Sequence, residues 1–322
     1  MRWGMRGYIV VCLIVAGITG LAYRALDRTI MSLGCFQPPP AGHFIAYCSS
    51  PGFGDYEHGA YYYGLQPETL PHLREADVLF FGTSRAQLAL STEALSRFFE
   101  RSTAKPYLLG FGYDEPGAFP LALVKKHHLK PDVIVILADP FFRDRTTGHV
   151  RVSSKNWFRW RVITELYEYT MKRGMIALGT TFCDLWPRSC SRTWALVYRS
   201  SRDGTWQTFA FDDSKHAPIT GPASITYTAA MAIADLPFAE RFIATTGVSR
   251  GCVVLSAAPS PLVNSDAYLT EIGRLLGVRV ALPKLDGLTS FDGSHLSADS
   301  AERWSAALLR EIGDTLESCA KR

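Results

Sequence analysis

The sequence lacks the patterns that mark several common classes of protein. It has no basic stripe with interleaved aromatic residues, and its formal net charge is only +4, so nothing in it favours nucleic-acid binding. No internal repeat is visible. Hydrophobic residues make up 47% of the 322-residue chain and charged residues 20%, which excludes a disordered chain and indicates a globular protein of one large or two small domains.

Metal-binding patterns are missing as well. None of the seven cysteines belongs to a paired C-x-x-C arrangement, and the histidines show no ligand spacing. His127 and His128 end a basic stretch that is typical of the solvated last turn of a helix. We therefore expect neither a metal ion nor another cofactor.

Only one segment is long and apolar enough to suggest a membrane span. Residues 7–23 carry no charge over seventeen residues. A helix of that length spans roughly 26 Å, just short of a hydrocarbon core of about 30 Å. Because Arg2 and Arg6 precede it, we expect residues 1–6 in the cytoplasm and the rest of the chain outside it. The chain would then be a single-pass protein of the inner (cell) membrane with a periplasmic or otherwise extracytoplasmic domain.

The same segment has a second interpretation as a cleaved signal peptide. It is short, and Gly20-Leu21-Ala22 resembles a small-x-small cleavage site. A buried helix of a soluble domain fits less well, because arginines flank the segment on both sides. Both of the favoured interpretations export the remainder of the chain.

The cysteine pattern agrees with export. Cys12 lies in the apolar segment, and the six others form an even number, which favours disulfides in an oxidising compartment. Cys252 and Cys319 could form one pair, but Cys252 could equally be a buried thiol. Two closer pairs could bridge short loops: Cys35 with Cys48, and Cys183 with Cys190.

The order of elements predicts an α/β fold. Residues 24–70 form an irregular connector rich in proline and glycine. In the domain at 71–322, apolar runs alternate with helical patterns, which predicts a three-layer, doubly wound, mostly parallel sheet. A segment rich in tryptophan and arginine, residues 143–228, interrupts the alternation as an insertion. Strands are expected at 76–82, 106–110, 131–138, 251–255 and 278–282, and helices at 91–100, 118–129, 229–245, 265–276 and 297–316.

The carboxyl ends of the predicted strands carry the residues with a chemical use. Ser84 follows the first strand, where a serine can expose its hydroxyl and place its amide at a helix N-terminus. It could also be an ordinary N-cap. Asp292 and His295 lie just before the last helix, and an aspartate three residues before a histidine can turn back onto its Nδ1. That segment could also be a simple surface turn.

Together these segments resemble the SGNH (GDSL-like) hydrolase superfamily, over about residues 76–318 without the insertion. The chain is most similar to the single-anchor proteins of bacterial cell-envelope acylation, of the teichoic-acid D-alanylation and alginate O-acetylation type. Those proteins combine a strand ending in Gly-x-Ser-Arg, a later strand ending in Asp-Pro-Phe-Phe, and a C-terminal Asp-x-x-His. The matching residues here are Gly82 to Arg85, Asp139 to Phe142, and Asp292 to His295.

The resemblance implies that Ser84 is the nucleophile, His295 the general base and acid, and Asp292 the orienting carboxylate. The amide of Ser84 would be one oxyanion donor. Gly112, in preference to Gly110, would be a second.

The chain departs from the family at the third donor. Typical members use an asparagine after the third strand, whereas this strand ends in Ala138-Asp139-Pro140. Losing one oxyanion donor costs about 3–4 kcal/mol of transition-state stabilisation. Asp139 could bind substrate, hold a loop or cap the strand end. Arg85 could contact an anionic or sugar substrate, or form a structural salt bridge.

The resemblance implies a membrane-anchored serine O-acyltransferase that acetylates an extracytoplasmic or secreted polysaccharide through an acyl-serine. It also implies a multi-spanning membrane O-acyltransferase as partner. A carbohydrate esterase or deacetylase would use the same intermediate with water as acceptor. A non-catalytic protein of this fold, which binds glycan or scaffolds an export complex, is the third reading, and the missing asparagine favours it. The tryptophans of the insertion could stack on sugars or form core.

Overall fold

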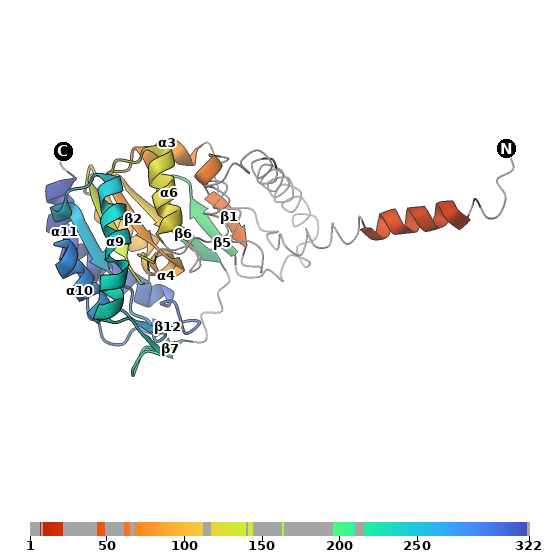
Figure 1. Cartoon of the computed structure of the whole chain (residues 1–322). Coiled ribbons are helices and arrows are strands. Elements are labelled where there is room, and N and C mark those ends of the chain that lie inside the picture. Colours follow the sequence, from red (N-terminus) through yellow and green to blue (C-terminus); the bar gives the residue numbers. More distant parts are fainter. Residues whose placement is uncertain are drawn as a thin grey trace.

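The computed structural model describes residues 7, 9–21, 61–64, 68–111, 117–139, 141–143, 163, 196–209 and 216–320, and the strand at 44–48. Within these residues the predicted α/β organisation is confirmed. A mostly parallel sheet lies at the centre, and helices cover both of its faces (Figure 1).

The central sheet has five parallel strands in the order β11-β9-β4-β2-β3. Strands β2, β4 and β9 are buried along their whole length, as expected for apolar runs in the middle of a parallel sheet. The chain reverses its direction of travel across the sheet between β2 and β4, which is where open α/β sheets place their ligand crevice. The strands are β2 (Val78–Gly82), β3 (Pro106–Gly110), β4 (Val133–Leu137), β9 (Val253–Ser256) and β11 (Arg279–Val280).

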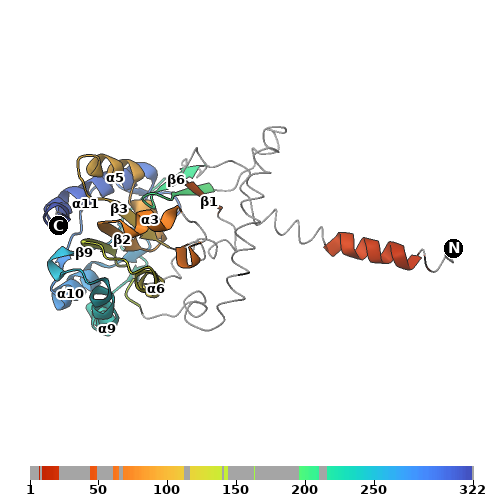
Figure 2. The same cartoon turned by 90° about the horizontal axis from the view of Figure 1, so that it is seen from above.

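Helices form a layer on each face of the sheet (Figure 2). On one face α11 packs against α4 and α5, and on the other α9 packs against α6 and α10. The C-terminal helix shows how the spacing of apolar residues in the sequence corresponds to burial in the structure. Trp304, Leu308, Ile312 and Leu316 recur every fourth residue, and all four are buried. The helices are α3 (Thr69–Arg74), α4 (Ser84–Ala89), α5 (Thr92–Phe99), α6 (Ala118–His127), α9 (Ala229–Thr246), α10 (Asp266–Leu276) and α11 (Ala298–Cys319).

The structure adds one helix and shortens one strand relative to the prediction. The helix N-terminus expected at Ser84 begins a separate short helix, α4, which was not among the predicted helices. The last strand was expected over residues 278–282, yet β11 has two residues. Its shortening has a local cause, because the amide of Val278 donates to the carbonyl of Gly273 and so belongs to the end of α10.

A second, antiparallel sheet joins two segments that the sequence presented as irregular. Strand β1 (Phe44–Cys48), in the expected connector, pairs with β5 (Leu196–Ser200), in the expected insertion, and β5 pairs with β6 (Trp206–Phe209). Buried Arg199 of β5 donates to the carbonyls of Leu108 and Gly110, at 2.6 and 3.2 Å. In the turn after β5, the carbonyl of Asp203 accepts from the amide of Leu108 at 2.7 Å. These contacts cover the free edge of β3, which would otherwise expose unpaired backbone groups.

Short strands complete the described part of the insertion and the loops around the last helix. Strand β7 (Ala217–Pro218) pairs with β12 (Thr289–Ser290), and β8 (Ile225–Thr226) pairs with β10 (Val263–Asn264). Of the five tryptophans that suggested a sugar-binding or core role, the structure describes Trp206, which packs partly buried against the core. The other four lie outside the described residues.

Cys252 and Cys319 form a disulfide, which decides between the two readings of Cys252. The bond joins the residue before β9 to the last residue of α11, 67 positions later, with the Cα atoms 5.8 Å apart. The two other suggested pairs each include a cysteine outside the described residues. Cys12 is free and exposed.

Removing this disulfide should destabilise the domain. Because the bond closes a 67-residue loop, we expect Cys252→Ala/Cys319→Ala to lower the free energy of unfolding by about 2–4 kcal/mol. Guanidinium unfolding followed by tryptophan fluorescence measures this. Both proteins are compared under oxidising conditions, where Cys12→Ser should match the wild type. Equal midpoints for the oxidised wild type and the double variant would contradict the prediction.

The apolar segment near the N-terminus is helical at residue 7 and over residues 9–21 (Figure 1). Its apolar side chains are exposed all around, with Leu13 at 67% and Leu21 at 71%. Among the described residues, no helix combines the length and the apolarity needed to cross a membrane.

Candidate active site

The first part of the site is the tight turn from β2 into α4. Thr83 caps the helix, because its Oγ1 accepts from the amide of Arg85 at 3.3 Å. Ser84 is therefore the first helical residue and not the N-cap, so its hydroxyl is available for other contacts. A Cβ on Gly82 would lie 2.3 Å from the Cβ of Ala86, so the helix can turn back this closely only over a glycine.

The second part is the loop between β12 and α11. One carboxylate oxygen of Asp292 accepts from the amides of Ser294 and His295, each at 2.8 Å. The other oxygen lies 2.6 Å from Nδ1 of His295. Gly293 adopts a left-handed φ of 81°, and its amide donates to Ser290 Oγ. These contacts fix the carboxylate and the imidazole relative to each other before any substrate binds.

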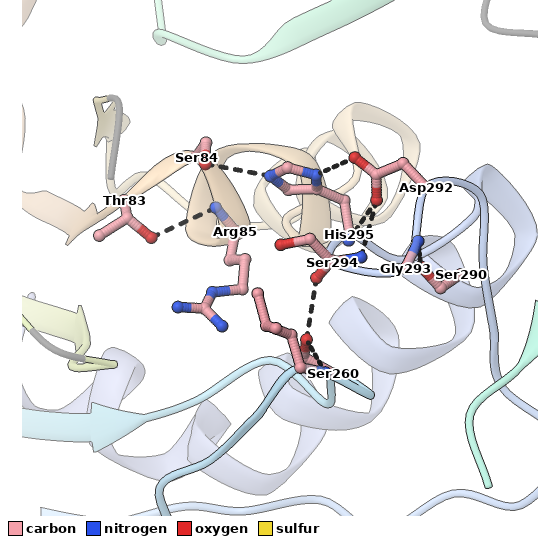
Figure 3. Close-up of polar contacts among 10 residues, drawn as sticks. Thr83, Ser84, Arg85, Ser260, Ser290, Asp292, Gly293, Ser294 and His295 are labelled. Atoms are coloured by element: carbon pink, nitrogen blue, oxygen red, sulfur yellow. Dashed lines mark hydrogen bonds and ion pairs between the residues drawn. The ribbon is translucent and has the colours of Figure 1, made fainter. Parts of the chain in front are cut away.

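The fold joins the two parts. Oγ of Ser84 lies 3.0 Å from Nε2 of His295, although the residues are 211 positions apart. Figure 3 shows the His295 ring between Ser84 and Asp292, with a hydrogen bond on each side. The last helix, α11, makes the meeting possible because it packs directly against α4. A hydroxyl, an imidazole and a carboxylate in this order form the arrangement that activates a serine for acyl transfer.

Electrostatics favour an ionised Asp292. Partial burial opposes its ionisation, but the hydrogen bond to His295, the electrostatic attraction to that residue and the two loop amides outweigh burial and lower the pKa of Asp292 to about 2. An ionised carboxylate at Nδ1 holds the imidazole proton there, which leaves Nε2 as an acceptor facing Ser84. The ring of Phe291 stacks on the imidazole, with centroids 5.8 Å apart.

Arg85 and Asp139 form a buried ion pair beneath this arrangement. Nε of Arg85 lies 3.0 Å from Oδ2 of Asp139, and the side chains are 8% and 1% exposed. Of the readings offered for Arg85, the structural salt bridge is the one observed, and in Figure 3 its side chain extends away from the Ser84–His295 contact. Burial raises the pKa of Asp139 to about 6, against the opposing charge of Arg85.

The raised pKa predicts a pH-dependent contribution to stability. The folded state favours the neutral carboxyl of Asp139, so this contribution is complete below pH 3.8 and is lost as the pH rises through about 6. The wild type should therefore lose about 2–3 kcal/mol more than Asp139→Asn between pH 4 and pH 7. Urea unfolding at both pH values gives the change in unfolding free energy from pH 4 to pH 7 for each protein. Comparing these two changes removes the part of the cost of the substitution that does not depend on pH. Parallel pH profiles would contradict the prediction.

The structure describes only part of the expected oxyanion hole. The amide of Ser84 lies in the first turn of α4, where N–H groups have no partner within the helix. Gly112, the favoured second donor, lies outside the described residues. Gly110 ends β3, and its carbonyl accepts from Arg199. Where typical family members have an asparagine, Asp139 lies buried against Arg85.

Several residues of the site were not found from the sequence. The sequence does not mark Thr83 as the N-cap, because its neighbour Ser84 is an equally suitable N-cap residue. Ser290 and Ser260 support the histidine loop from other segments, since Ser260 Oγ donates to the carbonyl of Ser294 at 3.1 Å. No local pattern marks Ser260, whose role depends on the packing of two distant loops.

One histidine prediction is wrong. His127 does not lie in a solvated turn but is buried, with Nε2 2.8 Å from the carbonyl of Tyr61. Burial opposes the charged form of the ring and lowers the pKa of His127. In the part of the chain that the structure describes, no group of three histidine, cysteine or acidic side chains is arranged to hold a metal ion.

Comparisons with known proteins identify no family for this chain. No protein-family model, curated protein or solved structure matches it. The resemblance to the SGNH superfamily, and the roles that it implies for Ser84, His295 and Asp292, therefore stay predictions.

Proposed function

We propose that this protein is a membrane-anchored serine O-acyltransferase of the SGNH type, which acetylates an extracytoplasmic or secreted polysaccharide. The observation that carries the proposal is the hydrogen-bonded series Ser84–His295–Asp292 at the carboxyl end of a parallel sheet. The strand reversal between β2 and β4 puts this series where α/β enzymes bind their ligands.

The proposed reaction has two halves. Nε2 of His295 takes the proton of Ser84 while Oγ attacks the donor carbonyl, and the amide of Ser84 stabilises the oxyanion. The tetrahedral intermediate collapses, the donor's leaving group takes the proton from His295, and an acyl-Ser84 ester remains. An acceptor hydroxyl then gives its proton to His295 and attacks the ester. The Ser84 oxygen leaves with that proton, and the acceptor carries the acyl group.

The exposed apolar helix supports the membrane part of the proposal. A helix that is hydrophobic on all sides needs an apolar environment that covers every face, and the described domain does not provide one. We propose that residues 7–23 anchor the chain in the inner membrane with the α/β domain on the periplasmic side. A multi-spanning O-acyltransferase would be the partner that delivers acyl groups there.

The proposal is tested with the full-length chain in detergent micelles, supplied with p-nitrophenyl acetate and a neutral oligosaccharide such as maltotriose. Mass spectrometry of the products separates the possible functions. An O-acetylated oligosaccharide that requires Ser84 supports transfer. Free acetate alone indicates an esterase. A chain that neither binds an acetyl group at Ser84 nor releases nitrophenolate faster than Ser84→Ala would overturn both and leave a binding or scaffold protein.

A further inference from the structure

A cavity lies beside the histidine loop, among residues to which the proposed mechanism gives no role. Its volume is about 330 Å³, near the lower end of the roughly 300–1,000 Å³ of small-molecule sites. The walls come from the loops that follow β9 and β11, the N-terminus of α10, and the segment between β7 and β8. The lining residues lie within 219–223, 257–260, 263–266 and 282–286.

Hydrogen bonds tie the cavity walls to the loop that holds Asp292 and His295. Ser260 lines the cavity, and its Oγ donates to the carbonyl of Ser294, the residue before His295 (Figure 3). On another wall, the amide of Ile219 donates to the carbonyl of Leu288 at 2.9 Å. Strand β7, just before Ile219, pairs with β12, just before the histidine loop. A ligand in the cavity would therefore lie against the structure that positions the imidazole.

Ser265 is the buried polar residue of the described cavity wall that lacks a side-chain contact. It occupies the N-cap position of α10 and lines the cavity, and it is only 3% exposed. Ser91 and Ser297 cap their helices with their side chains, but Ser265 makes no such bond, and its buried hydroxyl has no partner among the described residues. That hydroxyl is closed to solvent, so a bound hydrogen-bonding group would recover the free-energy cost of its missing contact only if the start of α10 shifted to open it to the cavity.

The charges around the cavity do not favour an anion. Lys284 is the basic residue among the lining residues, and its ammonium group is paired with Asp266. Asp286 adds a second carboxylate. Polar and apolar surface contribute about equally to the walls, and Val263, Leu282 and Leu285 are among the apolar side chains. Mixed walls that carry hydroxyl, amide and carboxylate groups, without a free cation in the described lining, suit a neutral ligand rich in hydroxyl groups.

We propose that this cavity is the acceptor subsite of the acyltransferase and holds one neutral sugar unit of the polysaccharide. This inference rests on the proposed function and adds the class of acceptor and its place. The cavity lining contains none of Ser84, Asp292 and His295, so the unit in the cavity anchors the polysaccharide. A hydroxyl of an adjoining unit gives its proton to Nε2 of His295 and attacks the carbonyl of acyl-Ser84. The new ester bond forms on the sugar as the bond to Ser84 Oγ breaks, and that oxygen recovers the proton.

Binding and acylation are measured separately. Saturation-transfer NMR of full-length Ser84→Ala in micelles measures binding of three neutral trisaccharides (maltotriose, cellotriose and mannotriose), with trigalacturonate as the anionic comparison. The nitrophenolate burst from p-nitrophenyl acetate measures acylation of Ser84 in a chain that keeps the serine. Two variants address the cavity: Ala223→Trp, which fills it, and Asp286→Ala, a milder change on an exposed wall residue. Ala244→Trp, on an exposed face of α9, is the matched control.

We expect at least one neutral trisaccharide to bind, and trigalacturonate to bind more weakly. Ala223→Trp should weaken binding and acyl transfer about tenfold or more and Asp286→Ala severalfold, while both keep the wild-type burst and Ala244→Trp changes nothing. Unchanged binding in both cavity variants, or preference for trigalacturonate, would overturn the subsite. A wild-type chain without a burst would instead overturn the acyltransferase proposal. If that chain still bound a neutral trisaccharide, and the cavity variants lost the binding, the cavity would be a sugar site in a protein without acyl transfer.

Discussion

Ser84→Ala is expected to slow the release of nitrophenolate from p-nitrophenyl acetate by about 10⁶-fold, because only the groups that bind the ester and its oxyanion remain. In the proposed mechanism, the Ser84 oxygen that lies 3.0 Å from His295 forms the covalent bond to the acyl group, and alanine has nothing to replace it. Stopped-flow measurement of the nitrophenolate burst provides the rate.

The matched control for this substitution is Ser91→Ala. Ser91 is also a serine at a helix start, but it caps α5 and lies outside the reacting series. Its loss should reduce stability slightly and leave the burst unchanged. If Ser84→Ala kept a burst near that of the wild type, Ser84 would not be the nucleophile.

Asp292→Asn is expected to lower the acylation rate by about 10⁴-fold without unfolding the loop. Its side-chain oxygen can still accept from the amides of Ser294 and His295, so the turn should persist. The amide nitrogen, however, would donate to Nδ1 of His295 and drive the ring proton to Nε2, where the ring can no longer accept from Ser84. The burst rate and near-ultraviolet circular dichroism measure the two effects.

Asp299→Asn is the control for this change, because Asp299 lies seven residues later on the exposed first turn of α11. It should leave the burst rate as in the wild type. A wild-type rate for Asp292→Asn would show that the carboxylate does not orient the histidine.

The main elements of the fold could be predicted because their burial patterns are local. Residues 106–110 were expected as a strand and form β3 with the same bounds. The buried residues from Trp304 to Leu316 predict α11 for the same reason, since the residues on one face of a helix recur every three to four positions. The disulfide was less accessible, because spacing alone left Cys252 open as a partner or a buried thiol.

The pairing of β1 with β5 could not be predicted, because about 150 residues separate the strands and neither carries a pattern that specifies the other. The same limit applies to the site. The order of Ser84, Asp292 and His295 suggested that they meet, but nothing local indicated that Arg85 would turn away from them and pair with Asp139. His127 was misplaced because its basic neighbours suggested solvent, whereas the carbonyl of Tyr61 gives the ring a buried partner.

The cavity could not be predicted from the sequence, because it depends on how separate segments pack. Its walls come from four segments, and one of them contains a buried hydroxyl that lacks a contact; no sequence pattern shows either feature. Ser265 looks in the sequence like any serine before a helix. Only the comparison with Ser91 and Ser297, which do cap their helices, sets it apart.

The central claim, that Ser84 carries an acyl group, is tested most directly by peptide mapping of the full-length chain after brief exposure to p-nitrophenyl acetate at mildly acidic pH. We predict one acetyl group on the peptide that contains Ser84, lost on longer incubation with an acceptor and absent from Ser84→Ala and His295→Ala. Acetylation confined to other residues, or equal in the wild type and both variants, would contradict the account.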